Sequence, residues 1–265
     1  MANYIFTDAQ RAKELERLRL IEQVFDPATQ RRILATGIAP GWQCLEVGAG
    51  AGSIAQWLSA TVGEQGKVVA VDLDTRFLTP LAAPNLTVLQ TDVQQLPLAL
   101  GQFDLVHARY VLIHNADFQV ALTKMLELLK PGGWLVLEEP DFAAARAIAA
   151  DPATSEAMER VKQAIAQMFA DRGMDYALGV KLPAICQTLG LQLRRIENDA
   201  NPVNGGSGLA TVMKLSALQL ADQYLATGKV TPGEIDTYCS GTEDPRVWTI
   251  YYATVGVVAQ KPGLE

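Results

Sequence analysis

The chain has 265 residues, of which 49% are hydrophobic and 19% charged, and its formal net charge is −7. This apolar content is too high for a disordered chain, and the length suits one large domain or a domain with a sizeable insertion. The acidic balance argues against a nucleic-acid partner, since proteins that follow phosphates need a basic stripe. The sequence has no run of about 18 apolar residues and no apolar core of a signal peptide near its start, so we expect a cytoplasmic protein that does not enter a membrane.

Metal-binding residue types are scarce. Only two histidines occur, and the three cysteines, Cys44, Cys186 and Cys239, are far apart and form no CxxC pair. In a cytosolic chain such cysteines are free thiols. We therefore expect no metal site.

The first forty residues predict two helices. Apolar residues recur at helical spacing from Leu15 to Phe25, and Asp26-Pro27 looks like an N-cap followed by proline at the first position of a second helix. We expect residues 1–39, with Tyr4 and Phe6 ahead of the helices, to form a lid over a bound ligand.

Strands and helices alternate from Gly41 to about Glu139. The strands are short and continuously apolar, as in a parallel sheet covered on both faces, and they occupy residues 44–47, 68–71, 86–89, 103–108 and 134–137. Helices between such strands imply right-handed crossovers. With two later strands, this predicts a doubly wound α/β fold with a mostly parallel, seven-stranded Rossmann-like sheet and helices on both faces.

The pattern changes after residue 140. Asp151-Pro152 begins a helix with one apolar stripe, a second helix spans about 178–189, and residues 191–196 alternate as a sixth strand. Residues 247–259 read as one final strand, rich in Val, Thr, Tyr and Trp. We therefore expect a single domain in which residues 141–246 form a helical insertion and 247–265 form the last strand and tail.

The strongest local signal is the glycine-rich loop Leu45–Ser53 between the first strand and its helix. Glycines allow the backbone to approach a ligand, and the helix N-terminus offers free N–H groups to a negative group. Gly50, Gly52 and Ala55 fit the dinucleotide pattern G-x-G-x-x-G/A, and Asp72 follows about twenty residues later. By itself the loop leaves three interpretations open: a dinucleotide site, a site for another nucleoside cofactor, or glycines that serve only tight packing.

The run from Glu46 to Gly52, E-V-G-A-G-A-G, resembles motif I of the class I S-adenosylmethionine-dependent methyltransferases. The resemblance continues in chain order through the segments Val69–Asp74, Thr91–Val93 with Leu96-Pro97, Phe103–Arg109 and Leu129–Leu135. Together these cover roughly residues 40–140. The similarity is greatest to the small-molecule branch, which includes quinone-type and natural-product enzymes. It implies S-adenosylmethionine as cofactor, with S-adenosylhomocysteine as product.

The resemblance also implies cofactor contacts. The acid at Asp72 would accept the ribose hydroxyls, Asp92 and the Val93 N–H would read the adenine edge, and Leu73 would pack on the adenine face. Glu46 is acceptable beside an ammonium or sulfonium, although it could equally accept loop N–H bonds. The expected cofactor-binding residues are Glu46, Gly48, Ala49, Gly50, Gly52, Asp72, Leu73, Asp92, Val93 and Arg109. Arg109, which follows the fourth strand, could instead pair with a substrate anion or with Glu138.

Other activities find less support in the sequence. A short-chain dehydrogenase needs Tyr-x-x-x-Lys, and no tyrosine has lysine at that spacing. The Asn/Asp-Pro-Pro-Tyr/Phe motif of many nucleic-acid amino-methyltransferases is replaced by Ala108-Arg109-Tyr110-Val111. We expect a small-molecule acceptor bound by a monomer or homodimer. A nicotinamide-dependent oxidoreductase and a non-catalytic cofactor-binding module remain as alternatives.

Methyl transfer from a sulfonium is an in-line displacement in which the enzyme mainly positions the nucleophile and excludes water. A base is needed only if the acceptor must lose a proton, so O-, N- and C-methylation all stay open. His114 is the candidate base, or else it packs at a helix start; His107 reads as a core histidine. The expected substrate-binding residues are Tyr110, Glu139, Asp141, Met168, Tyr176 and Met213, of which the apolar ones could instead fill the core.

Overall fold

A computed structural model of the protein describes residues 11–78 and 83–263. Its centre is a seven-stranded sheet with the order β3-β2-β1-β4-β5-β10-β7. The first five strands in this order are parallel, while β10 is antiparallel to both of its neighbours. The predicted seven-stranded, mostly parallel sheet is therefore confirmed. The strands are β1 (Gln43–Val47), β2 (Lys67–Asp72), β3 (Leu86–Gln90), β4 (Phe103–Arg109), β5 (Leu129–Asp141), β7 (Gln192–Asp199) and β10 (Ala253–Gln260).

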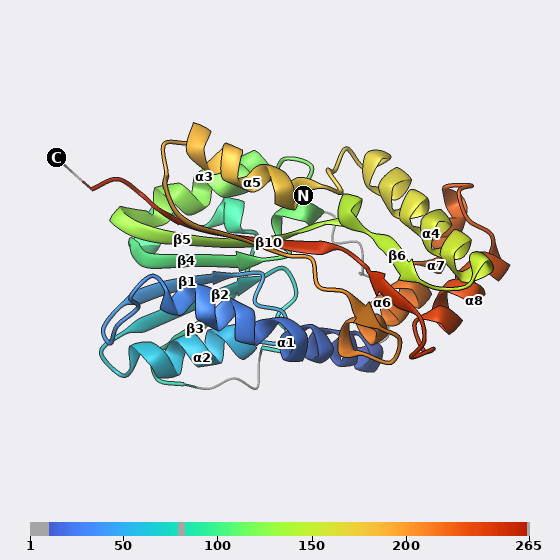
Figure 1. Ribbon diagram of the computed structural model, residues 1–265. Coiled ribbons are helices and arrows are strands. Elements are labelled where there is room, and N and C mark those ends of the chain that lie inside the picture. Colours follow the sequence, from blue (N-terminus) through green and yellow to red (C-terminus); the bar gives the residue numbers. More distant parts are fainter. Residues whose placement is uncertain (1–10, 79–82, 264–265) are drawn as a thin grey trace.

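Helices cover both faces of this sheet (Figure 1). One face carries α1 (Arg11–Leu34) and α2 (Ser53–Val62), and the other carries α3 (Phe118–Leu128) and α5 (Leu178–Thr188). Successive strand residues point to opposite faces, so Cys44 packs with the α1 and α2 cluster while Leu45 packs with the cluster on the other side. The strands are apolar on both faces because both faces are buried.

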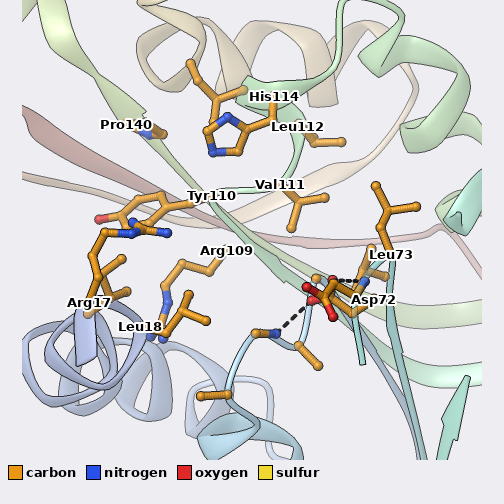
Figure 2. Close-up of a pocket in the computed structure, with 18 of the residues that line it drawn as sticks. Arg17, Leu18, Asp72, Leu73, Arg109, Tyr110, Val111, Leu112, His114 and Pro140 are labelled. Carbon is orange, nitrogen blue, oxygen red and sulfur yellow. Dashed lines mark hydrogen bonds between the residues drawn. The ribbon is translucent and has the colours of Figure 1, made fainter. Parts of the chain in front are cut away.

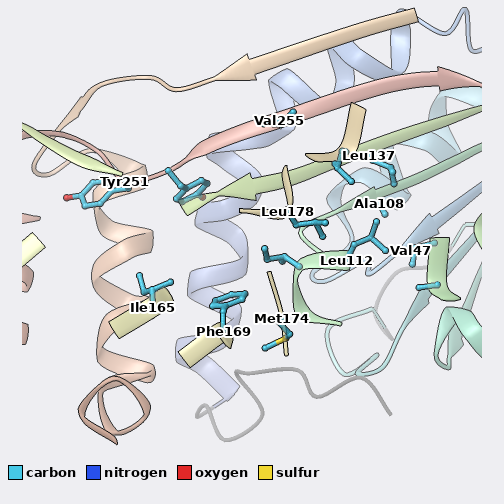
Figure 3. Packing of buried hydrophobic residues seen from close by; sticks show 14 of the residues in the cluster. Val47, Ala108, Leu112, Leu137, Ile165, Phe169, Met174, Leu178, Tyr251 and Val255 are labelled. Atoms are coloured by element: carbon cyan, nitrogen blue, oxygen red, sulfur yellow. The ribbon is translucent and has the colours of Figure 1, made fainter. Parts of the chain in front are cut away.

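A helical lobe stands beyond the carboxyl ends of the parallel strands (Figure 1). It contains α4 (Pro152–Ala170), α6 (Gly208–Gln219), α7 (Ala221–Ala226) and α8 (Pro232–Gly241), with a three-stranded sheet of β6 (Arg146–Ala149), β9 (Trp248–Ile250) and β8 (Val203–Asn204). Asp151 caps α4 and Pro152 is its first residue, as predicted. Figure 3 shows Ile165 and Phe169 of α4 in the same apolar cluster as Leu112 and Leu178, so the lobe and the sheet share one core.

The two predicted N-terminal helices are one continuous helix, and that prediction was wrong. Pro27 lies inside α1, which runs without a break from Arg11 to Leu34. The carboxylate of Asp26 accepts a hydrogen bond from Arg109 Nη2 at 2.8 Å and does not serve as the expected cap. Residues 1–10, including Tyr4 and Phe6, lie outside the described residues.

The predicted single strand over residues 247–259 was also wrong. It is two strands, β9 and β10, which belong to different sheets and are separated by the buried Tyr251 and Tyr252. The fifth strand is longer than predicted, because β5 continues to Asp141. Glu139 therefore lies within a strand and not in the loop after it, and this changes what its carboxylate can contact.

Three further findings concern the cysteines, membrane-spanning helices and groups of metal-binding side chains. The thiols of Cys44, Cys186 and Cys239 are all free and buried. Over the described ranges 11–78 and 83–263, no helix is both long and apolar enough to cross a bilayer. Over the same ranges, no three His, Cys, Asp or Glu side chains are grouped as metal ligands.

Arg32 of α1 packs against Gly256 of β10, and this close contact leads to a prediction about stability. Its side chain is 1% exposed, and its Nη1 donates to Glu138 Oε2 at 2.6 Å. A Cβ at Gly256 would overlap the Arg32 guanidinium, which is fixed by its ion pairs. We expect Gly256→Ala to lower the free energy of unfolding by about 1–3 kcal/mol, the usual cost of overpacking.

Urea unfolding of the purified variants tests this prediction. Gly233→Ala in α8 is the matched control, because nothing lies within 4 Å of its added Cβ, and a change within about 1 kcal/mol is expected there. If Gly256→Ala is as stable as the wild type, Arg32 is free to move and the packing argument is wrong.

Candidate functional site

A cavity of about 620 Å³ opens at the carboxyl ends of the parallel strands. In the sheet, β2 lies on one side of β1 and β4 lies on the other, so the strand order reverses at β1. The cavity lies at this switch point, where α/β sheets bind ligands. Figure 2 shows Asp72 and Leu73 at one side of this space, with His114 and Tyr110 above and Arg17 and Leu18 of α1 opposite them. The sheet, α1 and the helical lobe therefore share the walls of the cavity.

The glycine loop after β1 presents backbone to the cavity. Gly48 and Gly50 have φ values of 70° and 57°, which favour glycine. A Cβ at Gly48 would overlap the side chain of Val111, so this position is restricted by close approach as well as by conformation. Gly48, Ala49 and Gly50 line the cavity, whereas Gly52 does not, although sequence analysis included it.

Helix α2 begins against a carboxylate of the protein itself. The Ser53 N–H, in the first turn of α2, donates to Glu22 Oε1 of α1 at 3.0 Å. A helix N-terminus attracts phosphate through its free N–H groups and its dipole. Here Glu22 already supplies the negative charge, so this end of the cavity disfavours a pyrophosphate.

Asp72 ends β2 with its carboxylate held by backbone. Oδ2 accepts from the Gly50 N–H at 2.8 Å and Oδ1 from the Asp74 N–H at 3.0 Å, as Figure 2 marks with dashed lines for the bonds between the residues drawn. Burial raises the pKa of Asp72, although these hydrogen bonds oppose the shift. A carboxylate can accept about four hydrogen bonds, so Asp72 has room for a ligand hydroxyl beside its backbone donors. Leu73 beside it is 43% exposed and offers an apolar surface.

A second acid lies on the wall beyond β3. Asp92 accepts from the Gln94 N–H at 2.9 Å and so begins a one-turn 3-10 helix, Val93–Gln95. Thr91, Asp92 and Val93 all line the cavity. The geometry brings this edge into the same space as Asp72, as the sequence predicted.

Three ionisable side chains lie side by side in the middle of the sheet. Glu46 of β1 is the register partner of His107 of β4, and His107 Nδ1 lies 2.6 Å from Glu46 Oε2. On the other side, His107 Nε2 lies 3.4 Å from Glu138 Oε1. Burial alone would lower the pKa of His107, but the two carboxylates raise it to about 9. His107 is therefore an imidazolium at neutral pH, and Glu46, on the cavity wall, is paired with it.

Arg109 is held by α1. Its Nη2 donates to Asp26 at 2.8 Å and its Nη1 to Thr29 Oγ1 at 2.7 Å. Arg109 does line the cavity, as expected for a ligand contact. Its hydrogen bonds, however, tie the middle of α1 to the carboxyl end of β4.

The half of the cavity toward the helical lobe is aromatic. Tyr110 adopts φ 57°, the one non-glycine residue with positive φ within the described part of the chain. Its ring meets Phe25 edge-on at 5.2 Å and Tyr252 at 6.0 Å, and its hydroxyl lies 2.6 Å from Thr254 Oγ1. Phe142 packs on Tyr252 with ring centroids 5.2 Å apart. Met168 and Met213 complete this wall, so the cavity brings together Tyr110, Met168 and Met213, three of the expected substrate contacts.

Three expected substrate contacts lie outside the cavity wall. Glu139 is fully buried and accepts the N–H groups of residues 111–113 at 3.0, 2.7 and 3.2 Å, and burial raises its pKa to about 8. Asp141 accepts from the Ala143 N–H at 2.9 Å. Tyr176 borders a separate, shallow surface depression. The two acids thus hold backbone turns after β4 and β5.

His114 faces the cavity from the short 3-10 helix Leu112–His114, across from Arg17 (Figure 2). Burial and the charge of Arg17 lower the pKa of His114 to about 3. It is therefore a neutral imidazole near pH 7, which can accept a hydrogen bond but is a weak base.

The part of the cavity wall that α1 contributes was not predicted from the sequence. Arg17, Leu18, Ile21 and Glu22 line the cavity, as does Tyr252 from the turn between β9 and β10. Leu18 and Ile21 are part of the apolar helical repeat, so that repeat was the available signal. It shows which residues face inward, but it does not say that a ligand lies between them and the sheet.

The charge of His107 predicts a pH dependence of stability. Its folded pKa of about 9 exceeds the unfolded value of about 6.5, so its stabilising contribution is complete below pH 6.5 and is lost as pH rises through 9. Glu139 titrates in the same direction, so a variant is needed to isolate His107. We expect urea unfolding between pH 6 and 9.5 to show a steeper loss of stability in the wild type than in the double variant His107→Gln/Glu46→Gln, in which Glu46 cannot take up a proton in place of His107. Parallel curves would mean that His107 is neutral in the folded protein.

Comparisons with known proteins bear on the same region. The family described as a methyltransferase domain matches residues 45–137. The methyltransferase str2 of Strobilurus tenacellus is 28% identical over 195 residues, which are 71% of this chain and 70% of that protein. The ubiquinone/menaquinone biosynthesis C-methyltransferase UbiE of Ectopseudomonas mendocina is 31% identical over 112 residues. That match covers 39% of this chain and 44% of the relative, so it spans less than half of UbiE.

A solved structure shares the fold. The Haemonchus contortus phosphoethanolamine N-methyltransferase 2, in complex with phosphomonomethylethanolamine and S-adenosylhomocysteine, superposes with a TM-score of 0.56 at 16% identity. The alignment covers 92% of this chain and 57% of that one. At this identity the likeness shows the fold alone.

Proposed function

We propose that the chain is a class I S-adenosylmethionine-dependent methyltransferase and that it methylates a small, uncharged, partly aromatic organic acceptor. The observation that carries the proposal is the cavity itself. One half presents glycine backbone and carboxylates, and the other half presents aromatic rings. We assign residues 40–140, except Tyr110 and His114, to the cofactor; Tyr110, His114, residues 141–246 and Tyr252 to the acceptor; and the helix within residues 1–39 to the lid.

The residues of the first half fit this cofactor. When bound, S-adenosylmethionine supplies an electrophilic methyl group on a sulfonium. Asp72 would accept the ribose hydroxyls, Asp92 and Val93 would contact the adenine edge, and Leu73 would cover its face. The backbone of residues 48–50 would lie against the amino-acid tail, with Glu46 near its ammonium. The acceptor capacity that remains on Asp72 supports this fit, as do the positive φ values of Gly48 and Gly50, which present backbone at the cavity wall.

A nicotinamide dinucleotide fits the same residues less well. Its pyrophosphate would need the N-terminus of α2, where Glu22 already accepts the Ser53 N–H at 3.0 Å. Phosphate and carboxylate would repel each other in this partly buried place. The cofactor with no phosphate is therefore favoured.

The second half supports an uncharged acceptor. Its described charged residues are Arg17 and Glu14, and they pair with each other at 2.8 Å while both are buried. The rest of this wall is aromatic and aliphatic, including Tyr110, Phe142 and Met168. Such surfaces bind flat apolar molecules through ring stacking and burial.

Catalysis would depend mainly on position. His114 is a neutral imidazole with a lowered pKa of about 3, so it would orient an acceptor hydroxyl or amine by accepting its hydrogen bond. A strong base is not needed because the leaving group is already good. Closure by α1 and the lobe would exclude water from the nucleophile.

The ribose assignment predicts the effect of one substitution. Asp72→Ala should weaken binding of S-adenosylhomocysteine by about 1–3 kcal/mol, because the ribose hydroxyls lose their acceptor. Calorimetric titration measures this, with the exposed Asp117→Ala as control, since Asp117 does not line the cavity. An unchanged affinity in Asp72→Ala would refute the assignment.

The acceptor assignment predicts a preference among matched compounds. With S-adenosylmethionine present, hydroxylated aromatics, including hydroquinones, should be methylated, while analogues carrying a carboxylate or a sulfonate should react far more slowly. Replacing Met168 by Lys should reduce transfer and leave cofactor affinity unchanged, because a charge would then lie unpaired in the apolar wall.

Mass spectrometry of the products tests this second assignment. Preference for charged acceptors would contradict it. No transfer to any class despite cofactor binding would favour a non-catalytic binding module.

A further inference from the structure

We propose that His107 is a positioning residue for the cofactor: its imidazolium keeps Glu46 as a carboxylate at the cavity wall, where Glu46 binds the ammonium of the methionine tail. The inference rests on the proposed function. It gives a role to a fully buried histidine that the sequence suggested only as a core residue.

The first support is geometric. Glu46 and His107 are partners in the parallel register of β1 and β4, and His107 Nδ1 donates to Glu46 Oε2 at 2.6 Å. Among the described residues, none donates to Glu46 Oε1. Glu46 borders the cavity beside the loop of residues 48–50, so its second oxygen is available to a ligand donor.

The second support is electrostatic. A carboxylate buried alone takes up a proton, because burial disfavours its charged form. Burial raises the pKa of Glu46, and the charge and hydrogen bond of His107 offset part of that rise. A protonated Glu46 would bind an ammonium poorly, since a charge-assisted hydrogen bond is about twice as strong as a neutral one. Glu46 therefore needs a cation on the side away from the cavity.

The third support is that His107 has its own counter-charge. Glu138 of β5 lies 3.4 Å from His107 Nε2, and Arg32 of α1 donates to the other oxygen of Glu138 at 2.6 Å. Side chains of alternating charge form a row across β1, β4, β5 and α1, in the order Glu46, His107, Glu138 and Arg32. Nearby cations have carboxylate partners too: Arg109 pairs with Asp26, Arg31 pairs with Glu197, and Arg32 is shared with Glu197 and Asp199. The row thus keeps His107 charged without a net charge in the core.

Two ligands that differ only in the amino-acid tail test the proposal. S-Adenosylhomocysteine carries the ammonium, whereas 5′-methylthioadenosine keeps adenine, ribose and sulfur and lacks it. We expect His107→Gln to weaken S-adenosylhomocysteine binding at least tenfold and to leave methylthioadenosine binding within about twofold. Glu46→Gln should show the same selective loss, and the double variant should lose no more than either single one.

The pH profile adds a readout that a structural role would not move. Between pH 6 and 8 the wild-type affinity for S-adenosylhomocysteine should be flat. In His107→Gln it should rise with pH, because Glu46 without its cation keeps a proton to higher pH. Glu138, Arg109 and Arg32 face this position and are unchanged in the variant, so the slope reports Glu46.

The outcomes separate this inference from the proposed function. If the wild type binds neither ligand, the cofactor assignment fails. If the wild type binds both and His107→Gln weakens both equally, His107 is only structural and the inference is overturned.

A measurement on the wild type covers the case in which His107→Gln does not fold. The chain has only two histidines, so ¹⁵N-histidine NMR with His114→Gln assigns each signal. His107 should be an imidazolium from pH 6 to 8 and should shift with S-adenosylhomocysteine but not with methylthioadenosine. A neutral His107, or equal shifts, would overturn the inference.

Discussion

A carboxylate with no access to water, Glu138, fixes the arrangement of the sheet and α1. Its two charged partners are His107 of the neighbouring strand and Arg32 of α1. Leaving any member of such a buried set unpaired costs about 3–5 kcal/mol, so α1 must cross this face of the sheet where Arg32 reaches Glu138. With α1 in this position, Asp26 accepts a hydrogen bond from Arg109, and Glu22 accepts one from the Ser53 N–H at the start of α2. The wall of the cavity follows from these contacts.

This arrangement decides which ligands suit the cavity. Glu22 occupies the helix end that a phosphate would use, while Asp72 and Asp92 offer acceptors to hydroxyl and amino groups. The opposite half is lined by Tyr110, Phe142 and side chains of the helical lobe. The site therefore combines acceptors for a nucleoside without phosphate with an apolar chamber beside it, which agrees with the methyltransferase family and with an uncharged acceptor.

Features encoded in a few neighbouring residues could be predicted from the sequence. The loop of residues 45–53, Asp72 and the alternation of strands and helices are of this kind, because glycine conformation and strand burial are local requirements. The continuous α1 could not be predicted, because Asp26 bonds to Arg109, 83 residues away, and does not begin a second helix. Glu139 was expected to meet substrate, yet its oxygens hold the turn after β4. Both depend on partners that only the folded chain brings together.

The residues that line this cavity suit a sulfur-containing adenosine cofactor with no phosphate. Calorimetric titration of the wild-type protein with S-adenosylhomocysteine and, separately, with NADPH tests it most directly. The structure, with Glu22 at the start of α2, predicts saturable one-to-one binding of S-adenosylhomocysteine and no heat of binding with NADPH. Binding of NADPH without binding of S-adenosylhomocysteine would contradict the account.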